Sequence, residues 1–187
     1  MWFVEDEGNR VGHVASDGTI TEIPIPTDDS DPYGIVVGPD GNVWIAETNA
    51  NAIATMTPAG AFTALAVPTA ASDVHNIATG PDGNLWFTEF TGGNAIGRVT
   101  LAGAFDELAI PTPGGQPFDI TAGPDGNLWF TEKLGNNIGR ITPDAVFEEF
   151  AIPSKDALPA RITVGPDGAL WFTEFQTDSI GRLPIDP

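Results

Sequence analysis

Short apolar stretches alternate with polar turns along the whole chain, and no window keeps the 3.6-residue spacing of an amphipathic helix over ten residues. In one representative unit the pattern predicts four strands, at residues 117–122, 128–132, 137–142 and 146–153. We call the four strands of such a unit A, B, C and D. The Gly-Pro-Asp-Gly sequence between A and B predicts a tight hairpin, since Pro fixes the first turn dihedral and Gly accepts left-handed backbone.

The same unit recurs with a period of about 42 residues. The tryptophans at positions 2, 44, 86, 129 and 171 are spaced by 42, 42, 43 and 42 residues, and the Gly-Pro-Asp-Gly turns keep the same step. Four short strands per unit, with one Trp to pack between units, are typical of a β-propeller blade. The sequence therefore predicts an all-β propeller with its tryptophans in the core. We expect one domain over residues 1–187, with blades at about 1–28, 29–70, 71–113, 114–155 and 156–187.

The first and last predicted blades are each one strand short. The pattern predicts 18 strands, because the chain begins inside a B strand at Trp2 and stops after a C strand. Unpaired edges and the apolar flanks around Trp2 and Trp171 favour association. We expect a homo-oligomer, most simply a dimer, whose terminal blades meet or exchange strands. A five-bladed monomer closed by side-by-side packing is the alternative.

Composition narrows the partners. Twenty-six acidic residues against seven basic ones give a net charge of −19, which argues against nucleic acid or an anionic membrane as a partner. An acidic surface poor in Lys is typical of halophilic proteins, and ordinary solubility explains it equally well. The absence of Cys excludes disulfides and thiolate metal sites. No apolar run is long enough to span a membrane and no signal peptide is evident, so we expect a soluble protein whose compartment stays open.

Four motifs carry a specific resemblance. Leu-Trp-Phe-Thr-Glu, Asn-x-Ile-Gly-Arg-Ile-Thr, Phe-x-Glu-x-x-Ile-Pro and Pro-x-x-Ile-x-x-Gly-Pro-Asp-Gly together resemble the virginiamycin B lyase (streptogramin lyase) family over essentially the whole chain. The resemblance implies a segment of a seven-bladed propeller. It also implies a Mg²⁺-assisted elimination that linearises a cyclic depsipeptide, in which a base removes the proton α to a carbonyl. Motifs repeated in every blade do not by themselves define an active site.

The variable residues of the Pro-x-x-Ile motif are the candidate ligand contacts. The start of strand A and the end of strand B share one face of the predicted disc, beside the central channel, and positions that vary inside a repeated frame usually carry function. The predicted ligand-binding residues are Tyr33, His75, Asn76, Phe118, Asp119 and Arg161.

His75 is the candidate catalytic residue. The resemblance implies a His in Pro-His-x-Ile in two neighbouring blades, with a Glu beside them. His75 matches one of these positions, whereas the next blade has Phe118 there and the preceding one Tyr33, so the second His is absent. His13 does not replace it, because it occupies the Arg position of strand C. A histidine that is solvated or satisfied within the channel is the alternative.

A Glu ends every B strand on the same face. Each is predicted to order the following loop or to pair with the strand-C Arg, and Glu89 and Glu132 are the candidate metal ligands for Mg²⁺.

Two functions remain. We favour a non-enzymatic binding or scaffold module whose channel face takes up a small cyclic peptide, a cation or a partner segment, because the acid–base constellation is only half present. The alternative is a Mg²⁺-dependent carbon–oxygen lyase acting on a type B streptogramin through His75 and the Glu residues.

Overall fold

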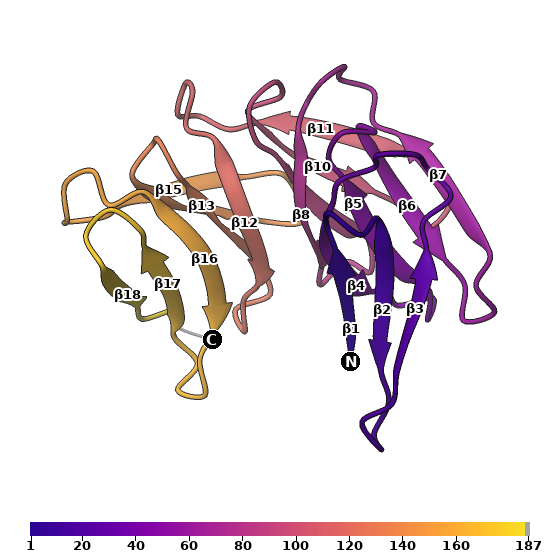
Figure 1. Cartoon of the computed structure of the whole chain (residues 1–187). Coiled ribbons are helices and arrows are strands. Elements are labelled where there is room, and N and C mark those ends of the chain that lie inside the picture. Colours follow the sequence, from indigo (N-terminus) through magenta and orange to yellow (C-terminus); the bar gives the residue numbers. More distant parts are fainter. Residues whose placement is uncertain (186–187) are drawn as a thin grey trace.

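The computed structural model describes residues 1–185 and contains 18 strands and no helix within them. The chain forms five antiparallel sheets that fan out side by side into an arc, with the two termini in its outermost sheets (Figure 1). The all-β propeller of about five blades is thus confirmed, and the part described has no helix that could cross a membrane. In chain order the strands are β1 (Trp2–Glu5), β2 (Arg10–Val14), β3 (Ile20–Pro24), β4 (Pro32–Val37), β5 (Val43–Glu47), β6 (Ala52–Met56), β7 (Phe62–Ala66), β8 (Val74–Thr79), β9 (Leu85–Glu89), β10 (Ala95–Val99), β11 (Phe105–Ala109), β12 (Pro117–Ala122), β13 (Leu128–Glu132), β14 (Asn137–Ile141), β15 (Phe147–Ala151), β16 (Pro159–Val164), β17 (Leu170–Glu174) and β18 (Ser179–Leu183).

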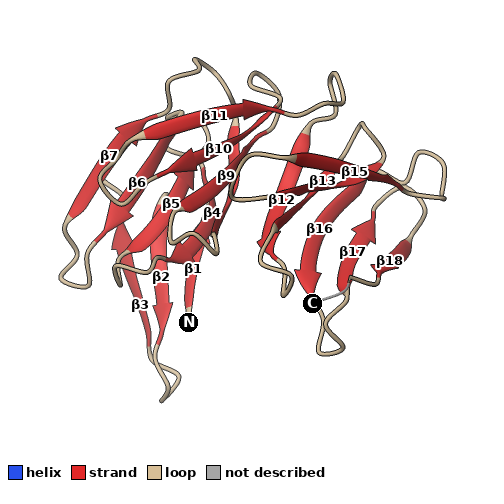
Figure 2. Cartoon of the chain, turned by 180° about the vertical axis from the view of Figure 1, so that it is seen from behind, coloured by secondary structure: helices blue, strands red, loops and turns tan. Residues whose placement is uncertain are grey.

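Each sheet keeps its strands in chain order. The three middle sheets, β4–β7, β8–β11 and β12–β15, have four strands, whereas β1–β3 and β16–β18 have three (Figure 2). The A strands β4, β8, β12 and β16 pack against one another along the inner side of the arc, and β1 packs on β4. Among residues 1–185 no packing of this extent joins β16 to β1, so the arc is open between its first and last sheets.

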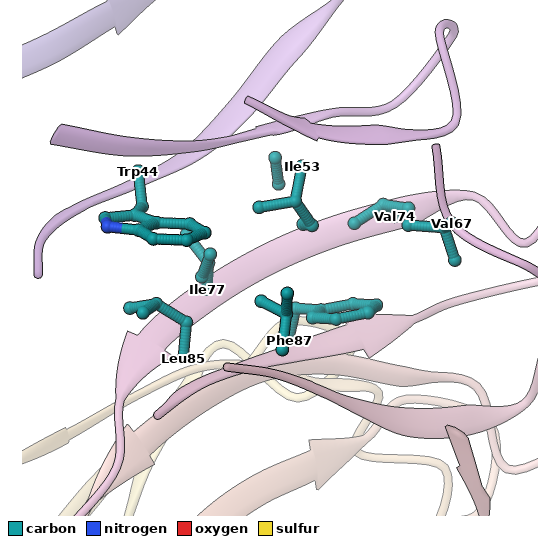
Figure 3. Close-up of a cluster of buried hydrophobic side chains, with 9 residues drawn as sticks. Trp44, Ile53, Val67, Val74, Ile77, Leu85 and Phe87 are labelled. Atoms are coloured by element: carbon teal, nitrogen blue, oxygen red, sulfur yellow. The ribbon is translucent and has the colours of Figure 1, made fainter. Parts of the chain in front are cut away.

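The core lies between the sheets. In one cluster Trp44 of the second sheet packs against Ile77, Leu85 and Phe87 of the third (Figure 3). Trp44, Trp86 and Trp129 are at most 2% exposed, which confirms that the repeated Trp is a core residue. Trp171 is 37% exposed, because no further sheet covers the last one in this chain.

The repeated Gly-Pro-Asp-Gly turn holds this Trp in place. In the third sheet Asp82 accepts hydrogen bonds from the Asn84 N–H (3.1 Å) and from Trp86 Nε1 (3.0 Å). The last Gly of the turn has a positive φ, 76° at Gly83, as the hairpin prediction requires. Arg98 of strand C stacks over the same Trp ring at 5.2 Å. The turn sequence is therefore repeated along the chain because its Asp holds the buried Trp of strand B in place.

Candidate functional site

Four β-bulges place the variable residues. Every A strand pairs with its B strand through a register shift that falls on the two central residues of Pro-x-x-Ile and its counterparts, such as His75 and Asn76 in β8. A bulge bends the strand and re-aims its side chains, and bulges are frequent beside functional sites. The predicted ligand-binding residues therefore lie at the bulges of the A strands, where the backbone is irregular in every repeat.

A threonine in strand B joins the bulges of the third and fourth sheets to the next sheet. Thr88 Oγ1 accepts a hydrogen bond from the Asn76 N–H (3.0 Å) and donates one to the Phe118 carbonyl (3.1 Å). Thr131 repeats this arrangement with the Asp119 N–H (3.1 Å) and the Ala160 carbonyl (2.8 Å). Neighbouring bulges are thereby held at a fixed separation, which fixes the relative positions of the side chains they carry.

Aromatic rings surround His75. Its ring centroid lies 3.7 Å from that of Tyr33, 4.2 Å from that of Phe118 and 5.3 Å from that of Phe90. His75 is 8% exposed, whereas the three aromatic rings belong to partly exposed residues. The imidazole is therefore the buried floor of an aromatic platform on the channel face.

The environment keeps His75 neutral. Burial lowers the pKa of His75 to about 4, and the nearby cations Arg161 and Lys133 also act to lower it. Its Nδ1 is buried and has no hydrogen-bond partner in the described chain. A neutral imidazole with this pKa is a weak base, and the covered Nδ1 reaches a ligand proton only if the surrounding rings move.

Two cations flank the platform. The Arg161 guanidinium lies 4.9 Å from the Tyr33 ring centroid and donates a hydrogen bond to the Tyr33 hydroxyl (3.0 Å), which links the fifth sheet to the second across the channel. Lys133 Nζ lies 4.6 Å from the Phe118 ring centroid. Cations held over aromatic faces are attracted by the ring quadrupole and present positive charge to the channel.

Asn76 and Asp119 connect the inner strands. Asp119 is 4% exposed and its carboxylate accepts hydrogen bonds from the Ile120 N–H (2.9 Å), the Ile162 N–H (2.9 Å) and the Asn76 amide. Burial raises the pKa of Asp119 although these donors lower it. The structure thus shows both side chains in contacts between strands, and their role as ligand contacts stays a prediction.

Glu89 and Glu132 lie between sheets. Both are 0% exposed, and burial raises the pKa of each to about 7, with the charges of Glu107 and Glu149 respectively acting in the same direction. In residues 1–185 no group of three or more His, Asp or Glu side chains is placed to hold a metal ion. The role of Glu89 and Glu132 as Mg²⁺ ligands therefore stays a prediction, and we assign no step to the ion.

Two of the strand-B Glu residues contact the following loop, and among residues 1–185 none pairs with a strand-C Arg. Glu132 accepts a hydrogen bond from Asn137 (3.0 Å) and Glu174 accepts one from Thr177 (2.9 Å), both after strand B. Arg98 instead pairs with Asp106 of strand D (2.5 Å), and Arg140 pairs with Glu148 in the same way. Glu132 and Glu174 therefore have the first of the two predicted roles, whereas Glu47 and Glu89 make no side-chain hydrogen bond with the described residues.

Phe90 and Lys133 were missed by the sequence prediction. They occupy equivalent positions, directly after the Glu that ends strand B, and both reach the platform around Phe118. The residue at this position differs from blade to blade, with Thr48 and Phe175 in two others. The variability that selected Tyr33 and its counterparts would also have selected this position.

These features define an open propeller arc with an aromatic, cation-flanked site on its channel face. The model of the virginiamycin B lyase family matches residues 1–53 and 22–187, and the chain belongs to this family.

Solved relatives agree with this membership. Virginiamycin B lyase from Staphylococcus aureus is 41% identical, with a TM-score of 0.90 over 100% of this chain and 66% of that one. A catalytically inactive histidine-to-alanine variant of that enzyme, solved with quinupristin, is 41% identical with a TM-score of 0.91 over 99% of this chain and 66% of that one. The virginiamycin B lyase of Nocardia farcinica is 52% identical over 42 residues, which are 22% of this chain and 15% of that protein. The chain thus spans about two thirds of the solved lyases.

Proposed function

We propose that this chain is a ligand-binding propeller arc whose channel face binds a cyclic depsipeptide of the type B streptogramin class, without turning it over. Tyr33, Phe90 and Phe118 offer partly exposed ring faces for an aromatic or apolar group of the ligand. Arg161 and Lys133 lie over these rings, where they can contact ester and amide carbonyl oxygens. The match to a lyase solved with quinupristin supports this ligand class.

The state of His75 is the observation that favours binding over turnover. Removing the proton α to a carbonyl requires a base whose free nitrogen can reach that proton. The Nδ1 of His75 is buried, and burial lowers the pKa of His75 to about 4. The neighbouring blades have Phe118 and Tyr33 at the equivalent position, so the second histidine that the resemblance implies is absent. The site therefore has the surface for recognition, and its one histidine is a weak base.

Lyase activity is the second candidate, because a specific comparison favours it. The solved relative loses activity when one histidine becomes alanine, and His75 matches the Pro-His-x-Ile position that the resemblance assigns to a base. In that case the α-proton would pass to His75, the ester C–O bond would break, and an alkene and a carboxylate would result.

Quinupristin distinguishes the two functions. We expect saturable binding by calorimetry, with at least a fivefold weaker affinity in Phe90→Ala. Phe175→Ala is the matched control, since Phe175 occupies the same position in the last blade and is 72% exposed. Elimination conserves mass, so turnover is followed by chromatographic retention and by new alkene proton signals. Absence of saturable binding would contradict the proposal, and an alkene product that His75→Ala abolishes would establish the lyase instead.

A further inference from the structure

Two neighbouring sheets contain the same pair of carboxyl groups. In the third sheet the strand-D residue Glu107 accepts a hydrogen bond from the Thr69 N–H (2.8 Å) and lies beside the buried Glu89 of strand B. In the fourth sheet Glu149 accepts one from the Thr112 N–H (2.9 Å) in the equivalent position. Each Thr follows the Pro that ends the preceding blade. A strand-D carboxylate thus fills the space between this N–H and the strand-B Glu.

The second sheet lacks the strand-D carboxylate. Ala64 pairs with Ala54 in the register that Glu107 and Glu149 have with the glycines of their own strand C. A pocket of about 120 Å³ remains, lined on its polar side by Thr27 and Glu47 and on its apolar side by Phe62 and Ala64. The pocket lies between the first and second sheets and includes no residue of the aromatic platform.

Two polar groups of this pocket, the Glu47 carboxylate and the Thr27 N–H, lack a hydrogen-bond partner in the part of the chain that the structure describes. Glu47 is 0% exposed and neither of its carboxylate oxygens makes a hydrogen bond with the described residues. The Thr27 N–H, which corresponds to the donors of Thr69 and Thr112, has no acceptor within residues 1–185. Buried polar groups are almost always hydrogen-bonded, so a buried carboxyl group without a partner, such as that of Glu47, is unusual. The pocket is therefore suited to a group that accepts a hydrogen bond from the Thr27 N–H and shares a proton with Glu47.

The size difference between the Glu of the neighbouring sheets and Ala64 indicates which ligand would fill the pocket. A Glu side chain exceeds that of Ala by one methylene and one carboxylate, which together are an acetate-sized fragment. We propose that the pocket binds a short-chain monocarboxylic acid of this size. Its carboxyl group accepts a hydrogen bond from the Thr27 N–H and shares one proton with Glu47. The two neighbouring sheets supply the same group from Glu107 and Glu149.

Binding of such an acid depends on pH. Burial raises the pKa of Glu47 above its usual range. The lining residues from β6, from β7 and from the loop before β4 contain no other titratable group. Above the pKa of Glu47 the complex must take up the shared proton from solution. The apparent affinity then falls about tenfold for each further pH unit.

Acetate itself is the probe. We expect saturable binding in calorimetry or ligand-observed NMR at about pH 5.5 that weakens toward pH 7.5, beyond any effect of sodium chloride at equal ionic strength. Ala64→Glu fills the pocket from within, so it should abolish acetate binding and raise the melting temperature. Glu107→Ala opens the matched pocket beside Glu89, so it should raise the stoichiometry from one to two.

Acetate binding that is unchanged in Ala64→Glu, or absent from the wild type, would overturn the proposal. If Ala64→Glu does not fold, the stoichiometry of Glu107→Ala decides, because one site or none in that variant also contradicts it. Neither result depends on quinupristin binding.

Discussion

Two equivalent tryptophans measure what packing between sheets contributes to stability. Trp86 and Trp171 each donate a 3.0 Å hydrogen bond from Nε1 to the Asp of their own turn, and each lies beneath a strand-C Arg. Their main difference is that Trp86 packs against the next sheet, whereas Trp171 has no further sheet to pack against. Substituting each by Ala therefore removes the same local contacts and isolates the contribution of the neighbouring sheet.

The expected costs follow from burial. Trp86 is 0% exposed, so Trp86→Ala removes a fully buried aromatic side chain and should cost about 3–5 kcal/mol of unfolding free energy. Trp171 is 37% exposed and should cost about 2–3 kcal/mol, in proportion to the area still buried. We expect a gap of about 1–2 kcal/mol between the two variants.

Urea unfolding followed by circular dichroism measures this gap. The two variants are compared at the lowest protein concentration that gives a signal, where the chains are separate. The measurement is then repeated at high protein concentration. Association through the last sheet would narrow the gap as concentration rises. Equal losses at low concentration would refute the reasoning, because they would mean that Trp171 is as fully covered as Trp86 within one chain.

Three further outcomes are expected. Burial, and then the charge of Glu107, raise the pKa of Glu89 from 4.5 to about 7. Glu89 therefore ionises at lower pH in the unfolded chain than in the folded one, and the wild type loses stability as the pH rises from about 4.5 to 7. Relative to the wild type, Glu89→Gln should have a higher melting temperature at pH 8 than at pH 5. Melting temperature should rise between 0.1 and 1 M NaCl, as screening shortens from about 10 to 3 Å, and no change would count against salt adaptation. Light scattering should give at least twice 19.6 kDa, and 19.6 kDa would contradict association.

The fold could be predicted almost strand by strand because the repeat shows each local preference four or five times. Residues 117–122 and 128–132 were placed with the bounds that β12 and β13 have. The fourth strand was predicted at 146–153 and spans Phe147–Ala151. Its ends differ because hydrophobicity continues beyond the ladder into residues that pack between sheets, such as Ile152 at 6% exposure.

The site could be predicted only as a set of positions. Sequence variability indicated Tyr33, His75 and Phe118, and the structure brings them into one cluster. It could not indicate that Asp119 faces the N–H of Ile162 in the next blade, because that contact depends on the angle between sheets. The pKa of His75 could not be predicted either, since it depends on burial beside rings that come from neighbouring sheets.

The proposed ligand site is tested most directly by the imidazole NMR signals during a quinupristin titration at neutral pH. The chain has two histidines, and His13 stacks on Trp2 in the first sheet, at a ring-centroid distance of 4.4 Å, apart from the platform. We expect the His75 signals to shift saturably while those of His13 stay fixed. Unchanged His75 signals, or equal shifts of both histidines, would contradict a ligand site on the channel face.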